Sequence, residues 1–246
     1  MAALCARLCN ADANRATVVR AANRGTMNTR YTLVLGTKDW SSWSLRAYVA
    51  MRATGAPFEE VFVRLRQQPL TGNEIRNHSA AGKVPILKIA EGSRNAIVWD
   101  SLAICETLAE RHPQAKLWPA DPFVRAEARS YAAEMHSGFA DVRDQLSMDF
   151  ARRLPLPQLR EETRAQLDRI IAAWSSALDR FASDGGYLFG GFSVADCMYA
   201  PVVSRFVTYG VTVPDSVKAY MNRMMGLPAM RDWGAAAQKE VDAGLA

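Results

Sequence analysis

Hydrophobic positions follow two different periods along this chain of 246 residues. Up to residue 111, short apolar or alternating runs predict four strands, over residues 31–35, 58–65, 84–89 and 96–99. Apolar positions at helical spacing predict three helices, over residues 44–55, 72–77 and 101–111. The first connection is a right-handed crossover and the last two strands form a hairpin, so we expect a mixed sheet.

The helical period takes over after residue 112. Three prolines between residues 112 and 122 predict a linker, and Asp121 followed by Pro122 is a typical helix start. The helix that begins there is expected to continue to about residue 151. Four more helices are expected, over residues 159–181, 193–209, 215–225 and 229–241. The pattern therefore predicts the fold class α/β + all-α.

Four segments follow from this pattern. They are an N-terminal extension (1–28), a thioredoxin-like α/β domain (29–111), a linker (112–121) and an all-helical domain (122–246). The extension is rich in Ala and Arg with Asp12 as its single acid, which suits a transit segment, but it has no Ser and no sustained apolar stripe. A start placed too far upstream of Met27 explains it equally well. In either case we expect the extension to be disordered and dispensable for folding.

Charge and cysteine usage exclude several classes of function. The formal net charge is +5, of which residues 1–26 carry +3, and basic residues elsewhere are interleaved with acids. Without a basic stripe and stacking aromatics, no nucleic-acid partner is expected. No window approaches the ~18 apolar residues of a membrane span. Four scattered cysteines and three separated histidines favour a reducing, cytoplasmic location and no metal site.

Several reaction classes lack their motifs. The chain has no G-x-x-x-x-G-K-[ST] loop, no G-x-G-x-x-G and no G-x-S-x-G elbow. No C-x-x-C stands at the start of the first predicted helix, which excludes a dithiol reductase despite the thioredoxin-like order of elements.

The segment Lys83-Val84-Pro85 heads the third predicted strand, next to the first strand–helix turn. A proline in this place is expected to be cis and to leave the N–H and C=O of Val84 free for an extended ligand. The alternative is an ordinary edge-strand proline.

Two groups of polar residues stand before helices. Ser101 can direct its hydroxyl and N–H at an anion, and the N-terminus of the helix adds positive potential there. Asp100 can accept a hydrogen bond from an ammonium group. The alternative is that this pair is a simple N-cap of the helix. Ser41 and Ser42 precede the first helix, while Ser44 is expected to serve as its cap or first-turn residue. We expect these groups to face one cleft with Pro85, beyond the carboxyl ends of the first and third strands.

In this order, the serines, the Val-Pro pair and the acid–serine pair resemble the cytosolic glutathione S-transferase family. Ser193-Val-Ala-Asp196 after Gly-Gly-Phe resembles that family's capping box, and the likeness covers about residues 30–235. The stretch Ser41-Ser-Trp-Ser-Leu-Arg46 resembles the serine-type zeta class, with Trp43 in place of a cysteine. Together with the stretch Ala-Glu-Met-His-Ser-Gly-Phe at residues 133–139, it is similar to a little-characterised bacterial subfamily.

The resemblance implies a role for each site residue. Ser41 would stabilise the glutathione thiolate. Glutathione, as co-substrate, would be held by Ser42, Lys83, Val84, Asp100 and Ser101. A small electrophile would lie against Trp43, Tyr131, Met135 and His136, unless these residues form the core between the domains. The family also implies a homodimer.

Three functions follow from the resemblance. The first is conjugation of glutathione to an electrophile. The second is a glutathione-dependent isomerase of the maleylacetoacetate type, although Trp43 departs from the motif of that class. The third is a non-catalytic ligand-binding protein on the same fold.

Overall fold

The computed structural model describes residues 29–181 and 185–246, so the expectation about residues 1–28 falls outside the described part. Four strands form one sheet in the order β2-β1-β3-β4. Strands β1 and β2 are parallel, whereas β3 is antiparallel to both β1 and β4. The predicted mixed sheet is confirmed. The strands are β1 (Arg30–Gly36), β2 (Glu59–Val63), β3 (Ile86–Glu91) and β4 (Arg94–Trp99).

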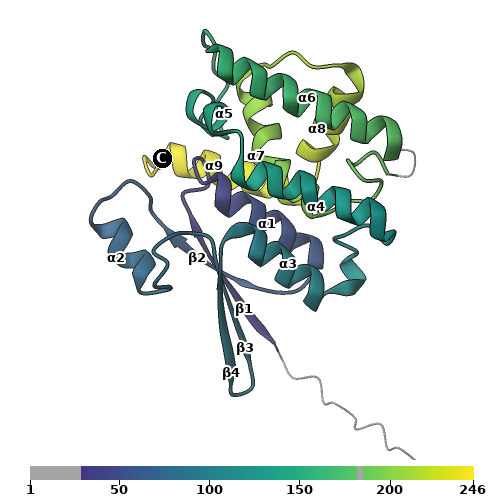
Figure 1. Ribbon diagram of the computed structural model, residues 1–246. Coiled ribbons are helices and arrows are strands. Elements are labelled where there is room, and N and C mark those ends of the chain that lie inside the picture. Colours follow the sequence, from purple (N-terminus) through teal and green to yellow (C-terminus); the bar gives the residue numbers. More distant parts are fainter. Residues whose placement is uncertain (1–28, 182–184) are drawn as a thin grey trace, which may run out of the picture.

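Helices cover the two faces of the sheet unequally. Leu33 and Leu35 of β1 join the main core beneath α1 (Ser42–Thr54) and α3 (Ser101–Arg111). Val34 lies between them in the sequence and points to the other face, where it packs with Ile75 of α2 (Leu70–Arg76). This is the alternation of side chains that a strand imposes. Figure 1 shows α1 and α3 lying between the sheet and the helices of the second half.

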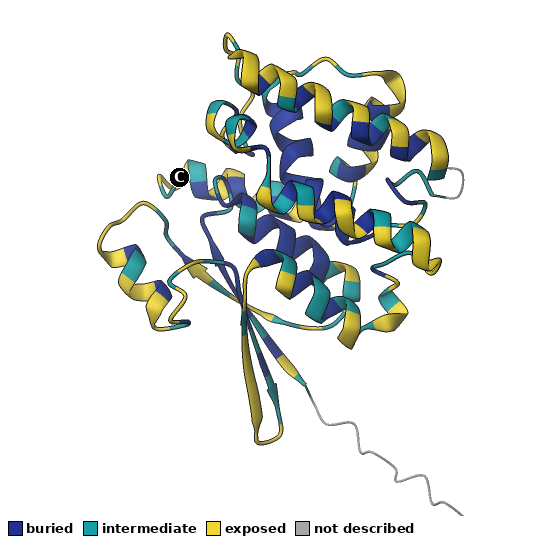
Figure 2. Cartoon of the chain, in the orientation of Figure 1, coloured by how far each residue is buried: buried dark blue, intermediate teal, exposed yellow. Residues whose placement is uncertain are grey.

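The second half of the chain is helical, as predicted. Its elements are η1 (Pro113–Ala115), α4 (Pro122–Ser137), α5 (Ala140–Gln145), α6 (Glu161–Phe181), α7 (Val194–Tyr209), α8 (Asp215–Met225) and α9 (Pro228–Asp242). Helix α7 packs against α1, α3, α4 and α8. It is buried along almost its whole length, as its dark colour in Figure 2 shows. The two halves therefore share one core.

The predicted long helix from residue 122 to residue 151 is wrong. Helix α4 ends at Ser137, Phe139 has a positive φ of 57°, and α5 stops at Gln145. A Cβ on Gly138 would lie 2.8 Å from the carbonyl oxygen of Glu134, so this close approach requires glycine. The apolar spacing continued across the break because Val142 and Leu146 still reach the same core.

The capping box before α7 is present and fully buried. Asp196 Oδ2 accepts the backbone N–H of Ser193 at 2.8 Å and its hydroxyl at 2.9 Å, and Asp196 Oδ1 accepts the N–H of Leu188 at 3.2 Å. Burial raises the pKa of Asp196 to about 6. The carboxylate of Asp196 therefore joins the start of α7 to the segment around Leu188.

Candidate active site

A cavity of about 920 Å³ lies where four segments of the chain meet. Val34 of β1 and Trp99 of β4 both pair with Ile86 at the start of β3, which brings the loops that follow β1 and β4 beside the loop that precedes β3. The cleft thus opens at the carboxyl ends of β1 and β4 and the amino end of β3. The expectation that it lies beyond the carboxyl end of the third strand is wrong, because that strand runs antiparallel to the first.

Eight of the ten predicted site residues line this cavity. They are Ser41, Ser42, Trp43, Lys83, Val84, Asp100, Ser101 and His136. They come from four separate segments of the sequence. The antiparallel pairing of β3 with β1 and β4 brings three of these segments together, and α4 supplies His136.

Tyr131 and Met135 do not line the cavity. Both lie on the face of α4 that packs into the helical core, where Met135 is fully buried. The Tyr131 hydroxyl donates to the carbonyl of Ala173 at 3.2 Å, and its ring packs edge-on against Phe189. His136 is rotated away from this face and reaches the cavity. Of the two alternatives, core packing applies to Tyr131 and Met135.

Ser41 caps helix α1 and lines the cavity at once. Its Oγ accepts the N–H of Ser44 at 3.4 Å, and its hydroxyl donates to Ser44 Oγ at 2.7 Å. Ser44 Oγ also accepts the N–H of Gly36 at 3.0 Å, which ties the helix to the end of β1. The cap is therefore Ser41, and Ser44 is a buried first-turn residue. A ligand atom in the cavity would compete with Ser44 for the Ser41 proton.

The loop that carries Ser41 is held by residues far away in the sequence. Glu240 Oε2 of α9 accepts the N–H of Lys38 at 2.6 Å and that of Asp39 at 3.3 Å. Trp233 Nε1 donates to the carbonyl of Lys38 at 2.9 Å, and Asp39 Oδ1 accepts the N–H of Ala151 at 2.9 Å. Helix α9 thus fixes the backbone that leads into Ser41.

Asp100 has an unusual backbone conformation, with φ 76°. Its Oδ1 accepts the N–H groups of Leu102 and Ala103 at 2.9 and 3.1 Å, and its Oδ2 lies 3.2 Å from His136 Nε2. A non-glycine residue at positive φ costs of order 1–3 kcal/mol and is concentrated at functional sites. The conformation turns the following Ser101 into the protein, where it is 1% exposed.

Ser101 presents a hydroxyl without a protein partner. Its Oγ is buried at the wall of the cavity and bonds to no atom of residues 29–181 or 185–246. Buried hydroxyls normally have a partner, so this one is available to a ligand. Lys83, which is exposed, and Val84, which is half-buried, also line the cavity, and the Val84–Pro85 peptide bond is cis.

The cavity also contains residues that sequence reasoning missed. Trp40, Arg66 and Gln68 line it, and the Arg66 guanidinium carbon lies 4.1 Å from the centroid of the Trp40 ring. Arg66 has a positive φ of 62°. The position of Trp40 directly before Ser41 was a usable signal, whereas nothing in the irregular stretch around residue 66 pointed to the site.

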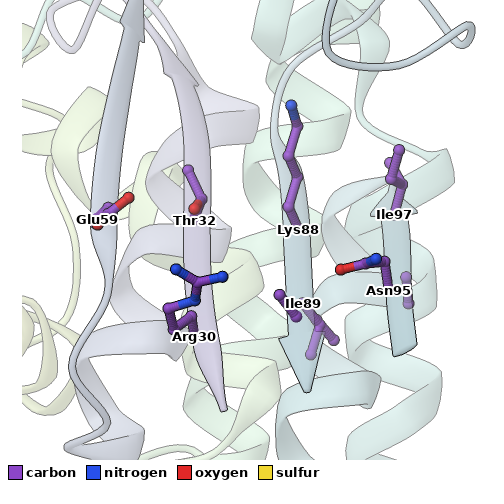
Figure 3. Close-up of a pocket in the computed structure, with 9 residues that line it drawn as sticks. Arg30, Thr32, Glu59, Lys88, Ile89, Asn95 and Ile97 are labelled. Atoms are coloured by element: carbon purple, nitrogen blue, oxygen red, sulfur yellow. The ribbon is translucent and has the colours of Figure 1, made fainter. Parts of the chain in front are cut away.

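A second, smaller pocket of about 400 Å³ lies on the sheet. Figure 3 shows side chains from all four strands around it, among them Arg30 of β1, Glu59 of β2 and Lys88 of β3. It contains none of the predicted site residues. Across the described part of the chain, no three His, Cys, Asp or Glu side chains gather as metal ligands would. No helix in that part is both long and apolar enough to cross a membrane.

Curated relatives share parts of this sequence. The chain is 26% identical over 179 residues to maleylacetoacetate isomerase of Pseudomonas aeruginosa, covering 70% of this chain and 81% of that protein. It is 29% identical over 155 residues to a stringent starvation protein A homolog of Pasteurella multocida, covering 60% and 68%.

Solved structures share the fold. Glutathione transferase Omega 2S from Trametes versicolor superposes with a TM-score of 0.65 at 19% identity, over 88% of this chain and 98% of that one. A glutathione transferase homolog from Burkholderia with bound glutathione gives 0.63 at 23% identity, over 85% and 98%. The family models for the N-terminal and C-terminal domains of glutathione S-transferase match residues 40–111 and 157–236. The chain belongs to the glutathione S-transferase family.

Proposed function

We propose that the protein is a glutathione transferase, which activates the glutathione thiol for attack on a small electrophile. The observation that carries the proposal is the meeting of Ser41, Val84 and Ser101 on the wall of one cavity. The Ser41 hydroxyl, at the start of a helix, suits a thiolate. The extended segment at Val84 suits a peptide backbone, and the unpartnered hydroxyl of Ser101, at the start of a second helix, suits a carboxylate.

Glutathione would lie across the cavity in one direction. Its γ-glutamyl end would meet Asp100 and Ser101, where the Ser101 hydroxyl lacks a protein partner. Its cysteinyl backbone would pair with Val84, and its glycine carboxylate would lie near the exposed ammonium of Lys83. Ser42, in the first turn of α1, would assist at the γ-glutamyl end or beside the sulfur.

Ionising the bound glutathione thiol at neutral pH requires a modest stabilising free energy. A thiol of pKa ~8.5 is about 3% ionised at pH 7, and lowering its pKa by two units makes it roughly 75% ionised, at about 2.7 kcal/mol. One hydroxyl donor supplies ~0.5–1.5 kcal/mol. A helix N-terminus supplies ~0.3–1 kcal/mol, or up to ~2 when partly buried. Ser41 and the start of α1 together are sufficient without a cationic base.

A second function is favoured by one observation. The chain aligns with maleylacetoacetate isomerase over 81% of that protein. An isomerase returns glutathione unchanged, whereas a transferase consumes it, so product analysis separates the two. A non-catalytic ligand-binding protein would hold glutathione without forming a thiolate.

The proposal is tested by three measurements on the full chain. Glutathione-affinity retention tests binding, and ultraviolet difference titration of bound glutathione reports the thiolate. A panel of electrophiles with product analysis then reports conjugation. We expect retention, a bound-thiol pKa near 6.5 and glutathione-containing products. Retention with no thiolate absorbance below pH 8 would favour the non-catalytic alternative.

The proposal includes a cytoplasmic location and a role in detoxification of electrophiles. Cys105 and Cys197 are free thiols buried in the core, as suits a reducing compartment.

A further inference from the structure

Three arginines from different helices gather beside the cavity, behind Trp43. They are Arg46 of α1, Arg143 of α5 and Arg205 of α7, and we call them the arginine cluster. The guanidinium carbons of Arg46 and Arg143 lie 4.3 and 5.4 Å from the centroid of the Trp43 ring. Arg143 Nη1 also donates to the carbonyl of His136 at 3.4 Å. The cluster thus contacts the ring of Trp43 and the backbone of His136, two residues that line the glutathione cavity.

Two members of the cluster are buried without acceptors. Arg46 is 0% and Arg205 is 3% exposed. Arg46 Nε, Nη1 and Nη2 and Arg205 Nε and Nη1 find no hydrogen-bond partner within the described residues. Nor does any carboxylate in the described ranges form an ion pair with a member of the cluster. Buried charges are normally paired, because removing an unpaired ion from water costs several kcal/mol.

The cluster remains charged at neutral pH. Burial, with repulsion by Arg205 and Arg143, lowers the pKa of Arg46 to about 9. Burial and the charge of Arg143 lower the pKa of Arg205 to about 10. Asp100 is the carboxylate whose charge opposes this for Arg46, but its oxygens already accept from Leu102, Ala103 and His136. The positive charge is therefore left without a counter-ion.

Stacking on Trp43 does not remove the need for an anion. A ring faces the flat side of a guanidinium, whereas the N–H donors point outward in its plane. Those in-plane donors are the atoms of Arg46 that lack acceptors. Because these donors are enclosed by protein, Arg46 and Arg205 contribute positive charge, whereas the half-buried Arg143 offers a planar guanidinium that a carboxylate can reach.

We propose that the arginine cluster binds a carboxylate of the second substrate. This inference rests on the proposed function, in which the two glutathione carboxylates lie at Ser101 and Lys83 and leave the cluster to another anion. Arg143 is half-buried and provides the open side of the cluster, and the body of the acid would lie against Trp43. The protein is thereby selective for anionic over neutral electrophiles.

Calorimetry with a matched pair of probes tests the proposal. Benzoate and benzamide differ in charge but have nearly the same shape, and both are titrated into the glutathione-saturated full chain. We expect benzoate to bind at least tenfold more tightly than benzamide. Arg143→Gln should weaken benzoate about tenfold and leave benzamide unchanged, and Arg143→Lys should recover part of the loss. Arg153→Gln, at an exposed arginine outside the cluster, is the matched control.

A kinetic arm uses 4-chloro-3-nitrobenzoate and its amide. Glutathione sulfur replaces chloride at the ring carbon, and the thiol proton goes to solvent. Arg143→Gln should reduce kcat/KM about tenfold for the acid and leave the amide within twofold. Equal affinity for benzoate and benzamide, or an unchanged benzoate affinity in Arg143→Gln, would overturn the proposal.

Glutathione binding, titrated separately, distinguishes the sources of the carboxylate. If Arg143→Gln weakened glutathione itself about tenfold, the cluster would hold a glutathione carboxylate and the assignment to the second substrate would be wrong. If benzoate bound through Arg143 while glutathione failed to bind, the proposed function would fail and the anion site would stand. If glutathione bound and conjugated without discrimination between acid and amide, the proposed function would stand and the anion site would fail.

Discussion

In the proposed mechanism, Ser41 uses one hydroxyl both to cap α1 and to stabilise the thiolate. As the cap of α1 it accepts the N–H of Ser44, and as a donor it points its proton at Ser44 Oγ. A thiolate is a stronger acceptor than a neutral hydroxyl, so a bound sulfur would attract that proton. The Ser41 oxygen accepts the N–H of Ser44 through a lone pair, while the Ser41 proton can be donated to the thiolate. Both hydrogen bonds can therefore exist at the same time.

Ser41→Ala should therefore change stability and acidity together. We expect the free energy of unfolding to fall by about 1 kcal/mol, the usual cost of a lost cap. The pKa of bound glutathione should rise by about one unit, which corresponds to ~1.4 kcal/mol of lost hydrogen bonding. Conjugation at neutral pH should drop about tenfold and recover partly as pH rises. Denaturant unfolding and ultraviolet titration measure the two effects.

Ser42→Ala is the matched comparison, since Ser42 lines the same cavity within the first turn. An unshifted thiol pKa in Ser41→Ala with a shift in Ser42→Ala would move the role to Ser42. No shift in either variant would leave the N-terminus of α1 as the main stabiliser.

At the scale of elements, the break between α4 and α5 decides which residues reach the cavity. Gly138 ends α4 directly after His136 and Ser137, and the chain then turns through Phe139. A straight continuation of α4 would carry Arg143 in another direction and separate it from the carbonyl of His136. The end of α4 thus helps to place both the cavity wall and the arginine cluster.

Gly138→Ala tests this element. The added Cβ would meet a backbone oxygen at 2.8 Å, and backbone atoms cannot move aside as a flexible side chain does. We expect the free energy of unfolding to fall by about 1–3 kcal/mol, the range for overpacking. Ser137→Ala, at an exposed neighbour, should stay within about 0.5 kcal/mol. Equal stabilities of the two variants in denaturant would contradict the close approach.

The capping carboxylate of α7 predicts a pH dependence of stability. Burial raises the pKa of Asp196 from 3.8 to about 6, so the folded state holds its proton more tightly than the unfolded state. Between these two values the folded state binds more protons, and the free energy of unfolding must fall as pH rises. We expect Asp196 to contribute a fall of up to about 3 kcal/mol between pH 4 and pH 6.

Asp196→Asn removes the titrating group and provides the control. Urea unfolding of both proteins from pH 4 to pH 7 should show the fall in the wild type and its absence in the variant. A wild type that gains stability relative to Asp196→Asn over this range would contradict the assignment.

Sequence reasoning predicted the elements whose cause is local. The apolar run of β1 and the caps at Asp100 and Asp121 are properties of a few neighbouring residues, and the structure contains all of them. The break at Gly138 was missed because apolar spacing continued across it. For Tyr131 and Met135, both the cavity and the core stayed open, because spacing alone does not say which neighbour a helix face meets.

The arginine cluster is a clearer example of a contact that local sequence patterns do not predict. Arg46, Arg143 and Arg205 lie on three helices that are far apart in the sequence. Nothing in the pattern of one helix indicates that its arginine meets the other two. Only the packing of α1 against α7, together with the reach of the Arg143 side chain to the Trp43 ring, brings these charges together.

For the whole molecule, exposed apolar residues point to association. Ile97 and Trp99 on the edge strand β4 and Phe123 at the start of α4 are 48%, 56% and 85% exposed. The family resemblance predicts a homodimer that pairs the α/β domain of one subunit with the helical domain of the other. Sedimentation should give about twice the 27.1 kDa of one chain, and Phe123→Glu should shift the protein toward the monomer. A mass near 27.1 kDa for the wild type at micromolar concentration would contradict the dimer.

The anchoring of the Ser41 loop by Glu240 has a consequence for biosynthesis. Glu240 follows Lys38 by 202 residues in the sequence, so the ribosome adds it long after the loop that it holds. Until α9 has left the exit tunnel, the N–H groups of Lys38 and Asp39 lack their acceptor. Domains usually fold as they emerge, N-terminal first. Here the α/β domain emerges early, but the loop that leads into Ser41 gains its anchor only after α9 has been synthesised.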